Sequence, residues 1–170
     1  MKNKSIVLTG FMAVGKSSVG RQLAKIKKYK FLDTDYMITQ EYGMSVSEIF
    51  DNYGESEFRQ AELRLAEKLC TMEKCVISTG GGMVTNEKII SMFLDNCYVV
   101  NLTADVDKII KNASRTDKRP LLRGKNREEI QMLIDNREVY YKKSHIRIDV
   151  TDMQIKETAK MIANKYKEEI

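Results

Sequence analysis

Short apolar runs alternate with longer segments of mixed apolar and charged residues along the chain. The runs have the length and composition of buried strands, and they cover residues 5–9, 31–33, 75–79, 98–102 and 146–150. Between them, apolar residues recur at near-helical spacing, as Val19 and Leu23 do on an otherwise charged segment. Five strands that alternate with helices predict an α/β fold with one parallel sheet covered on both faces.

Polar residues and glycines mark the expected helix ends. Ser45 and Glu48 have the spacing of a capping box, in which each side chain bonds the backbone of the other residue. Thr151 and Gln154 form a similar start for a final helix, and Gly54 predicts a break. The other helices are expected after residue 33 and at about 16–28, 57–70, 86–94, 105–113 and 126–142.

Composition narrows the class of protein. The chain has 170 residues, 42% of them hydrophobic, which favours a single folded domain over residues 1–170. The net charge of +5 suits anionic ligands but is modest for a dedicated nucleic-acid binder. Cys70, Cys75 and Cys97 fit neither a disulfide framework nor a zinc site, so we expect buried thiols. Without a targeting peptide or membrane span, a cytoplasmic protein is expected.

The segment Gly10–Ser17 carries the strongest chemical signal. Its sequence, GFMAVGKS, matches G-x-x-x-x-G-K-[ST] and lies between an expected strand and an expected helix, as a phosphate-binding loop (P-loop) requires. The backbone N–H groups of such a loop, with the start of the following helix, hold a triphosphate. We therefore expect Lys16 to reach the β- and γ-phosphates and the Ser17 hydroxyl to help coordinate Mg²⁺.

Two aspartates lie at the end of the second expected strand. Asp33 and Asp35 lie at the edge where ligands bind in open α/β folds, and strand alternation would send both side chains to one side. One carboxylate could support the magnesium shell while the other orients a hydroxyl group for phosphoryl transfer. The alternative is an acidic turn that caps the next helix.

Two arginines are candidates for binding an anion. Arg59 and Glu62 are three residues apart on a helix, where the carboxylate could orient the guanidinium, or the two could form an ordinary surface pair. Arg137 falls on an apolar helix stripe with Ile130 and Tyr141. Its charged group therefore needs an anionic partner, or its aliphatic stem must extend far enough for the charge to reach water.

Two further segments are rich in glycine or in basic residues. Gly80, Gly81 and Gly82 follow a buried strand, where they would allow a ligand to approach the backbone closely or form a simple flexible turn. Residues 114–125 are basic and non-periodic, as in a mobile lid or a solvated connection. In a lid, Arg119 could reach the phosphates on closure. His145 has no nucleophile in a recognisable arrangement, so we expect it to be structural.

In this order, the P-loop, Asp-x-Asp, Phe-Arg-x-x-Glu, Gly-Gly-Gly, Arg-Pro-Leu and Arg-x-x-x-Tyr motifs resemble the shikimate kinase family. The resemblance implies ATP-dependent phosphorylation of the 3-hydroxyl of shikimate, in the pathway to chorismate and the aromatic amino acids. It also implies a three-layer P-loop kinase fold, with a five-stranded parallel sheet in the order 2-3-1-4-5 and a mobile lid. Ala13 stands where many relatives carry glycine, Ser18 where threonine is frequent, and the lid is short.

The resemblance implies a role for each candidate residue. Lys16, Asp35 and Arg119 would be catalytic, with Asp35 on the reacting hydroxyl, while Ser17 and Asp33 would hold Mg²⁺. The ATP-binding set would comprise Ala13, Val14, Gly15, Lys16, Ser17, Ser18, Arg115 and Arg119. The shikimate-binding set would comprise Asp35, Arg59, Glu62, Gly80, Gly81, Gly82 and Arg137. Arg59 and Arg137 would grip the shikimate carboxylate, and Arg115 would pack against adenine.

Two rival functions stay open on the sequence alone. One is another small-molecule kinase of the same fold, such as a gluconate or nucleotide kinase. The other is a non-catalytic P-loop protein that binds nucleotide, or nucleic acid through its basic loop, although such a module would not need Asp35 and paired arginines. We expect shikimate and ATP as partners, no nucleic acid or membrane, and a monomer.

Overall fold

A computed structural model describes residues 4–115, 122 and 124–168. Its five strands form one parallel sheet in the order β2-β3-β1-β4-β5, which confirms the expected fold. The strands are β1 (Ile6–Thr9), β2 (Lys30–Asp33), β3 (Cys75–Ser78), β4 (Tyr98–Thr103) and β5 (Ile146–Asp149). Because every strand runs the same way, all five carboxyl ends meet at one edge of the sheet, where the P-loop begins.

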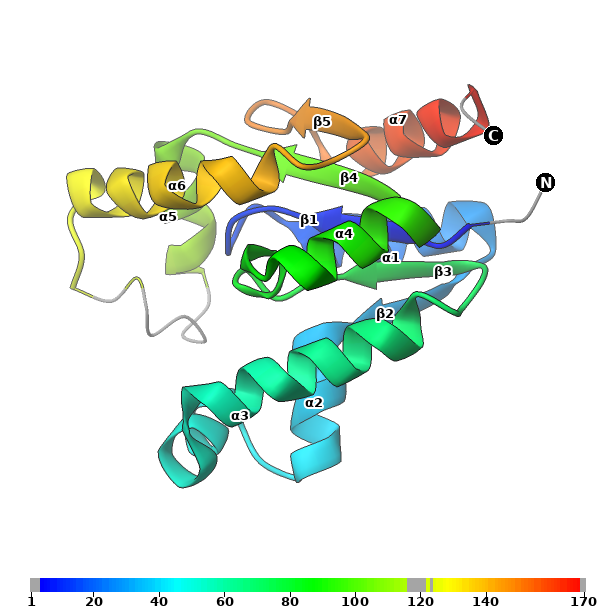
Figure 1. Cartoon of the computed structure of the whole chain (residues 1–170). Helices are drawn as coiled ribbons and strands as arrows, with labels where there is room; N and C mark the ends of the chain where they lie inside the picture. Colours follow the sequence, from blue (N-terminus) through cyan, green and yellow to red (C-terminus); the bar gives the residue numbers. More distant parts are fainter. Residues whose placement is uncertain (1–3, 116–121, 123, 169–170) are drawn as a thin grey trace.

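Helices cover both faces of the sheet (Figure 1). They are α1 (Lys16–Lys27), α2 (Thr34–Tyr42), α3 (Val46–Leu69), α4 (Glu87–Asn96), α5 (Val106–Ser114), α6 (Arg127–Tyr141) and α7 (Ile155–Glu168), with a short 3₁₀ turn, η1 (Met83–Thr85). The helices α1 and α7 pack together on one face, and α3, α4 and α6 lie on the other. The basic segment at residues 114–125 lies mostly outside the described residues, so the expected lid is not tested.

The sheet separates two apolar cores. Val7, on β1, packs with Ile77 and Phe93 on the α3 and α4 side. Its neighbour Leu8 packs with Leu23 and Ile162 on the α1 and α7 side. Successive strand residues thus point to opposite faces, and both faces are buried, as the nearly continuous apolar runs of a parallel sheet predict.

Capping explains where several helices begin and end. The predicted box at Ser45 and Glu48 is confirmed, and Asn126 forms a second box with Glu129. Gly54 interrupts α3 with φ 83° and ψ 163°, which confirms the predicted break. The box predicted at Thr151 is wrong, because its hydroxyl donates to Asp149 (2.6 Å) and accepts from the Asp105 N–H (3.0 Å). Helix α7 begins only at residue 155.

The predictions for the cysteines and for His145 can be compared with the structure. Cys75 and Cys97 are buried free thiols, but Cys70 is partly exposed, so the prediction of three buried thiols is wrong for that residue. The Nδ1 atom of His145 accepts from the Val99 N–H (2.9 Å) beside a stacked Tyr98 ring, which fits a structural role. Within the described residues, no helix is long and apolar enough to cross a membrane.

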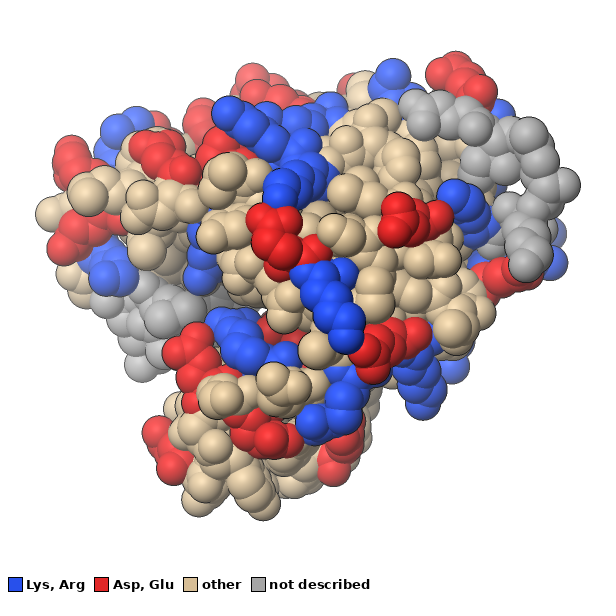
Figure 2. All heavy atoms as spheres, in the orientation of Figure 1, with Lys and Arg blue, Asp and Glu red and all other residues tan. Residues whose placement is uncertain are grey.

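Charged residues are distributed over the surface without a basic stripe on the visible face. Figure 2 shows lysine and arginine interspersed with aspartate and glutamate on this side of the molecule.

Candidate active site

The P-loop connects β1 to α1 and needs glycine at two positions. Gly10 has φ 139°, and a Cβ there would lie 2.3 Å from the backbone oxygen of Leu102, which cannot move aside easily. Gly15 has φ 106°. Ala13 also has a positive φ, 63°, in a region that side chains other than glycine rarely adopt. The carbonyl of Ala13 accepts a hydrogen bond from Nδ2 of Asn112 on α5 (2.9 Å), which anchors the strained turn.

The Lys16 side chain lies along this loop. Its Nζ atom donates to the carbonyl oxygens of Gly10 (2.7 Å) and Phe11 (3.0 Å), and the residue is buried. Lys16 also lines a cavity beside the P-loop, together with Ala13, Val14, Gly15, Ser17 and Ser18. A lysine and the residues of a glycine-containing loop therefore border one space, as binding of a polyphosphate requires.

Oxygen atoms from three segments meet beside the start of α1. The Ser17 hydroxyl donates to Oδ2 of Asp33 (2.8 Å) and lies 3.2 Å from the Ser78 hydroxyl. The Oδ1 atom of Asp33 accepts from the N–H of Tyr36 and caps α2 (3.2 Å). The two interpretations of Asp33 are therefore compatible, because one oxygen caps the helix while the other faces the P-loop.

These oxygen donors fit a magnesium ion. Mg²⁺ prefers oxygen ligands and commonly takes only one or two from the protein, with water and phosphate oxygens supplying the rest. Accordingly, the described part of the chain contains no group of three or more His, Cys, Asp or Glu side chains that could hold a metal alone. The Ser17 hydroxyl and the Asp33 carboxylate would thus depend on the nucleotide to complete the site.

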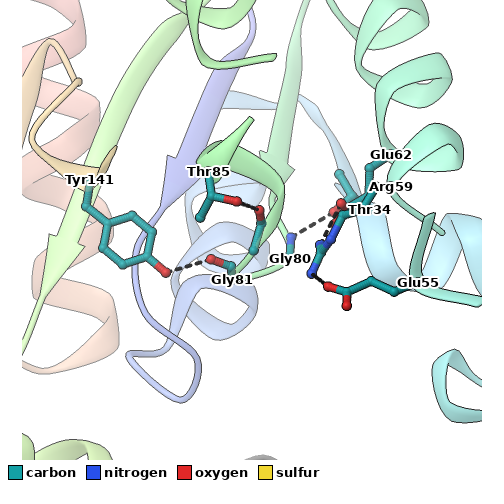
Figure 3. Close-up of polar contacts among 9 residues, drawn as sticks. Thr34, Glu55, Arg59, Glu62, Gly80, Gly81, Thr85 and Tyr141 are labelled. Atoms are coloured by element: carbon teal, nitrogen blue, oxygen red, sulfur yellow. Dashed lines mark hydrogen bonds and ion pairs between the residues drawn. The ribbon is translucent and has the colours of Figure 1, made fainter. Parts of the chain in front are cut away.

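Asp35 lines the same cavity, but a different element from the predicted one positions it. It lies in the first turn of α2 and not on a strand, so the argument from strand alternation is wrong. Both Asp33 and Asp35 nevertheless line the cavity. Asp35 lies against Gly80, where a Cβ would come within 2.5 Å of its Oδ1 atom. The Gly80 N–H also donates to the Thr34 hydroxyl (2.9 Å), which joins this turn to α2 (Figure 3).

The other two glycines lie against the two candidate arginines. A Cβ on Gly81 would lie 3.4 Å from Nη1 of Arg137, and one on Gly82 would lie 2.9 Å from Nη1 of Arg59. The Tyr141 hydroxyl donates to the carbonyl of Gly81 (2.6 Å) and fixes the turn to α6 (Figure 3). Three consecutive glycines thus allow three functional side chains to approach the backbone, which a simple flexible turn does not explain.

Arg59 forms an ion pair that is buried on one side. Its Nη1 atom lies 2.7 Å from Oε2 of Glu62, whose side chain is only 2% exposed, so the surface-pair interpretation is wrong. Burial raises the pKa of the Glu62 carboxyl, and the contact with Arg59 opposes that shift. The second arginine nitrogen, Nη2, lies 3.1 Å from Oε1 of the exposed Glu55, a contact that sequence patterns did not single out.

Arg137 has an unused donor. Its Nη1 atom is buried and has no hydrogen-bond partner among the described residues, and its guanidinium lies 5.7 Å from the centre of the Phe11 ring. Buried N–H donors normally have acceptors. The unsatisfied Nη1 atom therefore favours a binding role for Arg137 over the alternative in which its side chain only carries the charge to water.

The cavity beside the P-loop has a volume of about 410 Å³ and extends beyond the loop. Its far wall is formed by α5 and the start of α7 and includes Lys108, Asn112, Arg115, Met153, Gln154 and Ile155. Apart from Arg115, these residues were missed because they belong to no motif and adjoin the P-loop only in the folded chain. Arg119 lies outside the described residues.

Comparison with known proteins decides the family. The family model described as shikimate kinase matches residues 12–169. The chain belongs to the shikimate kinase family. The shikimate kinase of Thermoanaerobacter pseudethanolicus is 41% identical over 164 residues, which are 96% of this chain and 96% of that protein. The resemblance seen in the ordered motifs is thereby confirmed.

Solved structures support the same assignment. The structure of shikimate kinase from Acinetobacter baumannii in complex with shikimate has a TM-score of 0.91 at 28% identity and covers 98% of this chain and 94% of that one. A gluconokinase from Sinorhizobium meliloti 1021 covers 98% of this chain and 95% of its own, but with a TM-score of 0.57 and 14% identity. The gluconokinase shares the fold alone, whereas the shikimate kinases also share sequence.

Proposed function

We propose that the chain transfers the γ-phosphoryl group of ATP to the 3-hydroxyl group of shikimate, giving shikimate 3-phosphate and ADP. Two sets of residues would share this work. The P-loop and Asp33 would hold the phosphates and the metal, whereas Asp35, the glycine triplet and the two arginines would hold the acceptor.

On the nucleotide side, the amides from Ala13 to Ser18 and the Lys16 ammonium would bind the phosphate oxygens. Mg²⁺, held by Ser17 and Asp33, would neutralise charge on those oxygens. The far wall of the cavity would accommodate the nucleoside, with Arg115 near the base and Arg119 closing over the phosphates. Support for the nucleoside site comes from the continuous cavity that joins the P-loop to α5 and α7.

On the acceptor side, Arg59 and Arg137 would grip the shikimate carboxylate. Two guanidinium groups offer planar pairs of N–H donors that match a carboxylate, which a lysine cannot reproduce. Glu62 would keep Arg59 directed at the site through its buried ion pair. The backbone of Gly81, tied to Tyr141, would supply a further polar contact.

Asp35 would orient the reacting hydroxyl group and accept its proton as the oxygen attacks. Phosphoryl transfer depends mainly on positioning and on stabilising charge, so a correctly placed carboxylate and fixed cations account for most of the catalysis. Exclusion of water by the lid would prevent hydrolysis of ATP.

The observation that carries this proposal is the packing of Asp35, Arg137 and Arg59 against Gly80, Gly81 and Gly82 in turn. A module that only bound nucleotide would not need a carboxylate and two arginines converging on one turn beside the P-loop. We also propose that the enzyme works in the cytoplasm as a monomer, with neither a nucleic-acid nor a membrane partner.

The test is release of ADP from Mg-ATP by the purified protein, with shikimate and with quinate and gluconate as controls. Shikimate-dependent release supports the proposal. Release with gluconate alone would favour the other small-molecule kinases, and nucleotide binding without release would favour a non-catalytic protein. Filter binding across a salt series tests the nucleic-acid alternative, since tight, steeply salt-dependent binding would support it.

A further inference from the structure

Arg59 has both terminal nitrogens engaged by the protein before any substrate is considered. Nη1 lies 2.7 Å from Glu62 and Nη2 lies 3.1 Å from Glu55, as the two dashed contacts around Arg59 in Figure 3 show. A substrate carboxylate that pairs with this guanidinium must therefore share it with two carboxylates or replace one of them.

The two partners of Arg59 differ greatly in how easily they can leave. The Glu62 side chain is 2% exposed, so removing its partner would leave a buried charge uncompensated. The Glu55 side chain is 69% exposed, and a carboxylate at such a position is well solvated whether or not it is paired. Glu55 is thus the partner that can be exchanged at small cost.

The backbone gives Glu55 room to move. Gly54, the residue before it, breaks α3 with φ 83° and ψ 163°, and nothing lies within 4 Å of the position that a Cβ would occupy there. Glu55 therefore begins the second part of α3 instead of lying within a continuous helix. The Glu55 side chain, 69% exposed, therefore lies in solvent next to a break in the helix.

Negative charge is also crowded around Arg59. Burial is the main cause of the raised pKa of Glu62, and the nearby carboxylates of Asp35 and Glu55 raise it further. An incoming carboxylate would be a fourth negative charge near a single guanidinium, with Arg137 approaching from the other side of the triplet. Repulsion among like charges opposes such a complex unless one group withdraws.

We propose that Glu55 holds the position of the substrate carboxylate on Arg59 in the empty enzyme and is displaced when shikimate binds. This inference rests on the proposed role of Arg59. Glu55 keeps the guanidinium in place between turnovers. Displacing Glu55 reduces the free energy gained when shikimate binds, so the site binds shikimate more weakly than the two arginines alone would.

Glu55→Gln tests the proposal by removing the charge while keeping the shape. Titration calorimetry of shikimate with the full chain is expected to give a dissociation constant about 2- to 5-fold lower than that of the native protein, as for loss of an exposed charge pair. The dissociation constant for ATP should not change. With the methyl ester of shikimate, which lacks the charge, the variant should bind no more tightly than the native protein.

Asp51→Asn is the matched control, because it removes the same charge from an exposed residue four positions earlier, on the other side of the Gly54 break. An equal increase in shikimate affinity in this control would show a general charge effect and overturn the proposal. An equal increase in the affinity of Glu55→Gln for the methyl ester would overturn it in the same way. Unchanged or weaker shikimate binding in Glu55→Gln would overturn it too, and weaker binding would make Glu55 an orienting group. Arg59→Lys tests the proposed role of Arg59 separately from the displacement of Glu55. Unchanged shikimate binding in that variant would refute the role of Arg59 itself.

Discussion

The two sides of the site are built in contrasting ways. The nucleotide side comes largely from one eight-residue loop, whose backbone N–H groups and single lysine would do most of the binding. The acceptor side comes from side chains on α2, α3 and α6 that meet a glycine turn after β3. The first is a local structure, whereas the second exists only when distant segments fold together.

This difference predicts which substitutions should lower the stability of the fold and which should weaken substrate binding. In the P-loop, a glycine faces the backbone of another strand, so a side chain there should disturb the fold. In the glycine triplet, the nearest neighbours are the ends of flexible side chains, so a substitution should disturb substrate binding and leave the fold intact. The following variants test that distinction.

Asp35→Asn should have the largest effect. The amide cannot accept the hydroxyl proton, so we expect kcat to fall about 100-fold or more, the usual range for loss of a general base. Binding of ATP, measured by calorimetry, should stay within about 2-fold of the native value, since the P-loop is unaltered. Near-native turnover would remove Asp35 from its proposed role.

Gly10→Ala should destabilise the fold. A Cβ would meet the Leu102 carbonyl oxygen at 2.3 Å, and alanine would be forced to φ 139°. We expect the free energy of unfolding in urea to fall by about 2–4 kcal/mol, from strain added to a backbone clash. A variant as stable as the native protein would show that the P-loop can shift away from β4.

Arg137→Lys should act on the acceptor alone. Lysine keeps the charge but loses the planar pair of donors, so KM for shikimate should rise about 10- to 100-fold. KM for ATP serves as the internal control and should change little. Equal increases in both constants would contradict recognition of the shikimate carboxylate by Arg137.

Gly82→Ala should have the smallest effect of the four. The new methyl group would lie 2.9–3.0 Å from the two terminal nitrogens of Arg59, which can move. We expect KM for shikimate to rise about 5- to 10-fold, less than for loss of a charged hydrogen bond, with unfolding free energy within about 1 kcal/mol of native. If stability falls as far as in Gly10→Ala, the distinction between the two sides fails.

The sequence predicted the nucleotide side better than the acceptor side for a physical reason. The P-loop is fixed by residues that are adjacent in the chain, so Gly15, Lys16 and Ser17 could be assigned from spacing alone. The sheet order, by contrast, came from the family resemblance, because hydrophobic periodicity identifies strands without ordering them.

Other features depended on contacts that no spacing records. Strand alternation was applied to Asp35, although this residue lies beyond the strand in the first turn of α2, where helical geometry sets the direction of its side chain. The Arg59 pair looked like a surface pair until the fold buried Glu62. Met153 and Gln154 reach the cavity only because β5 lies at the edge of the sheet beside β4.

The glycine triplet also constrains how the sequence can change over evolution. Each of its three positions is matched to one side chain on a separate helix, at Asp35, Arg137 and Arg59. A mutation in the turn would therefore need a compensating change elsewhere in the chain before function returned. Drift at these six positions should be coupled, while the exposed faces of the same helices remain free to vary.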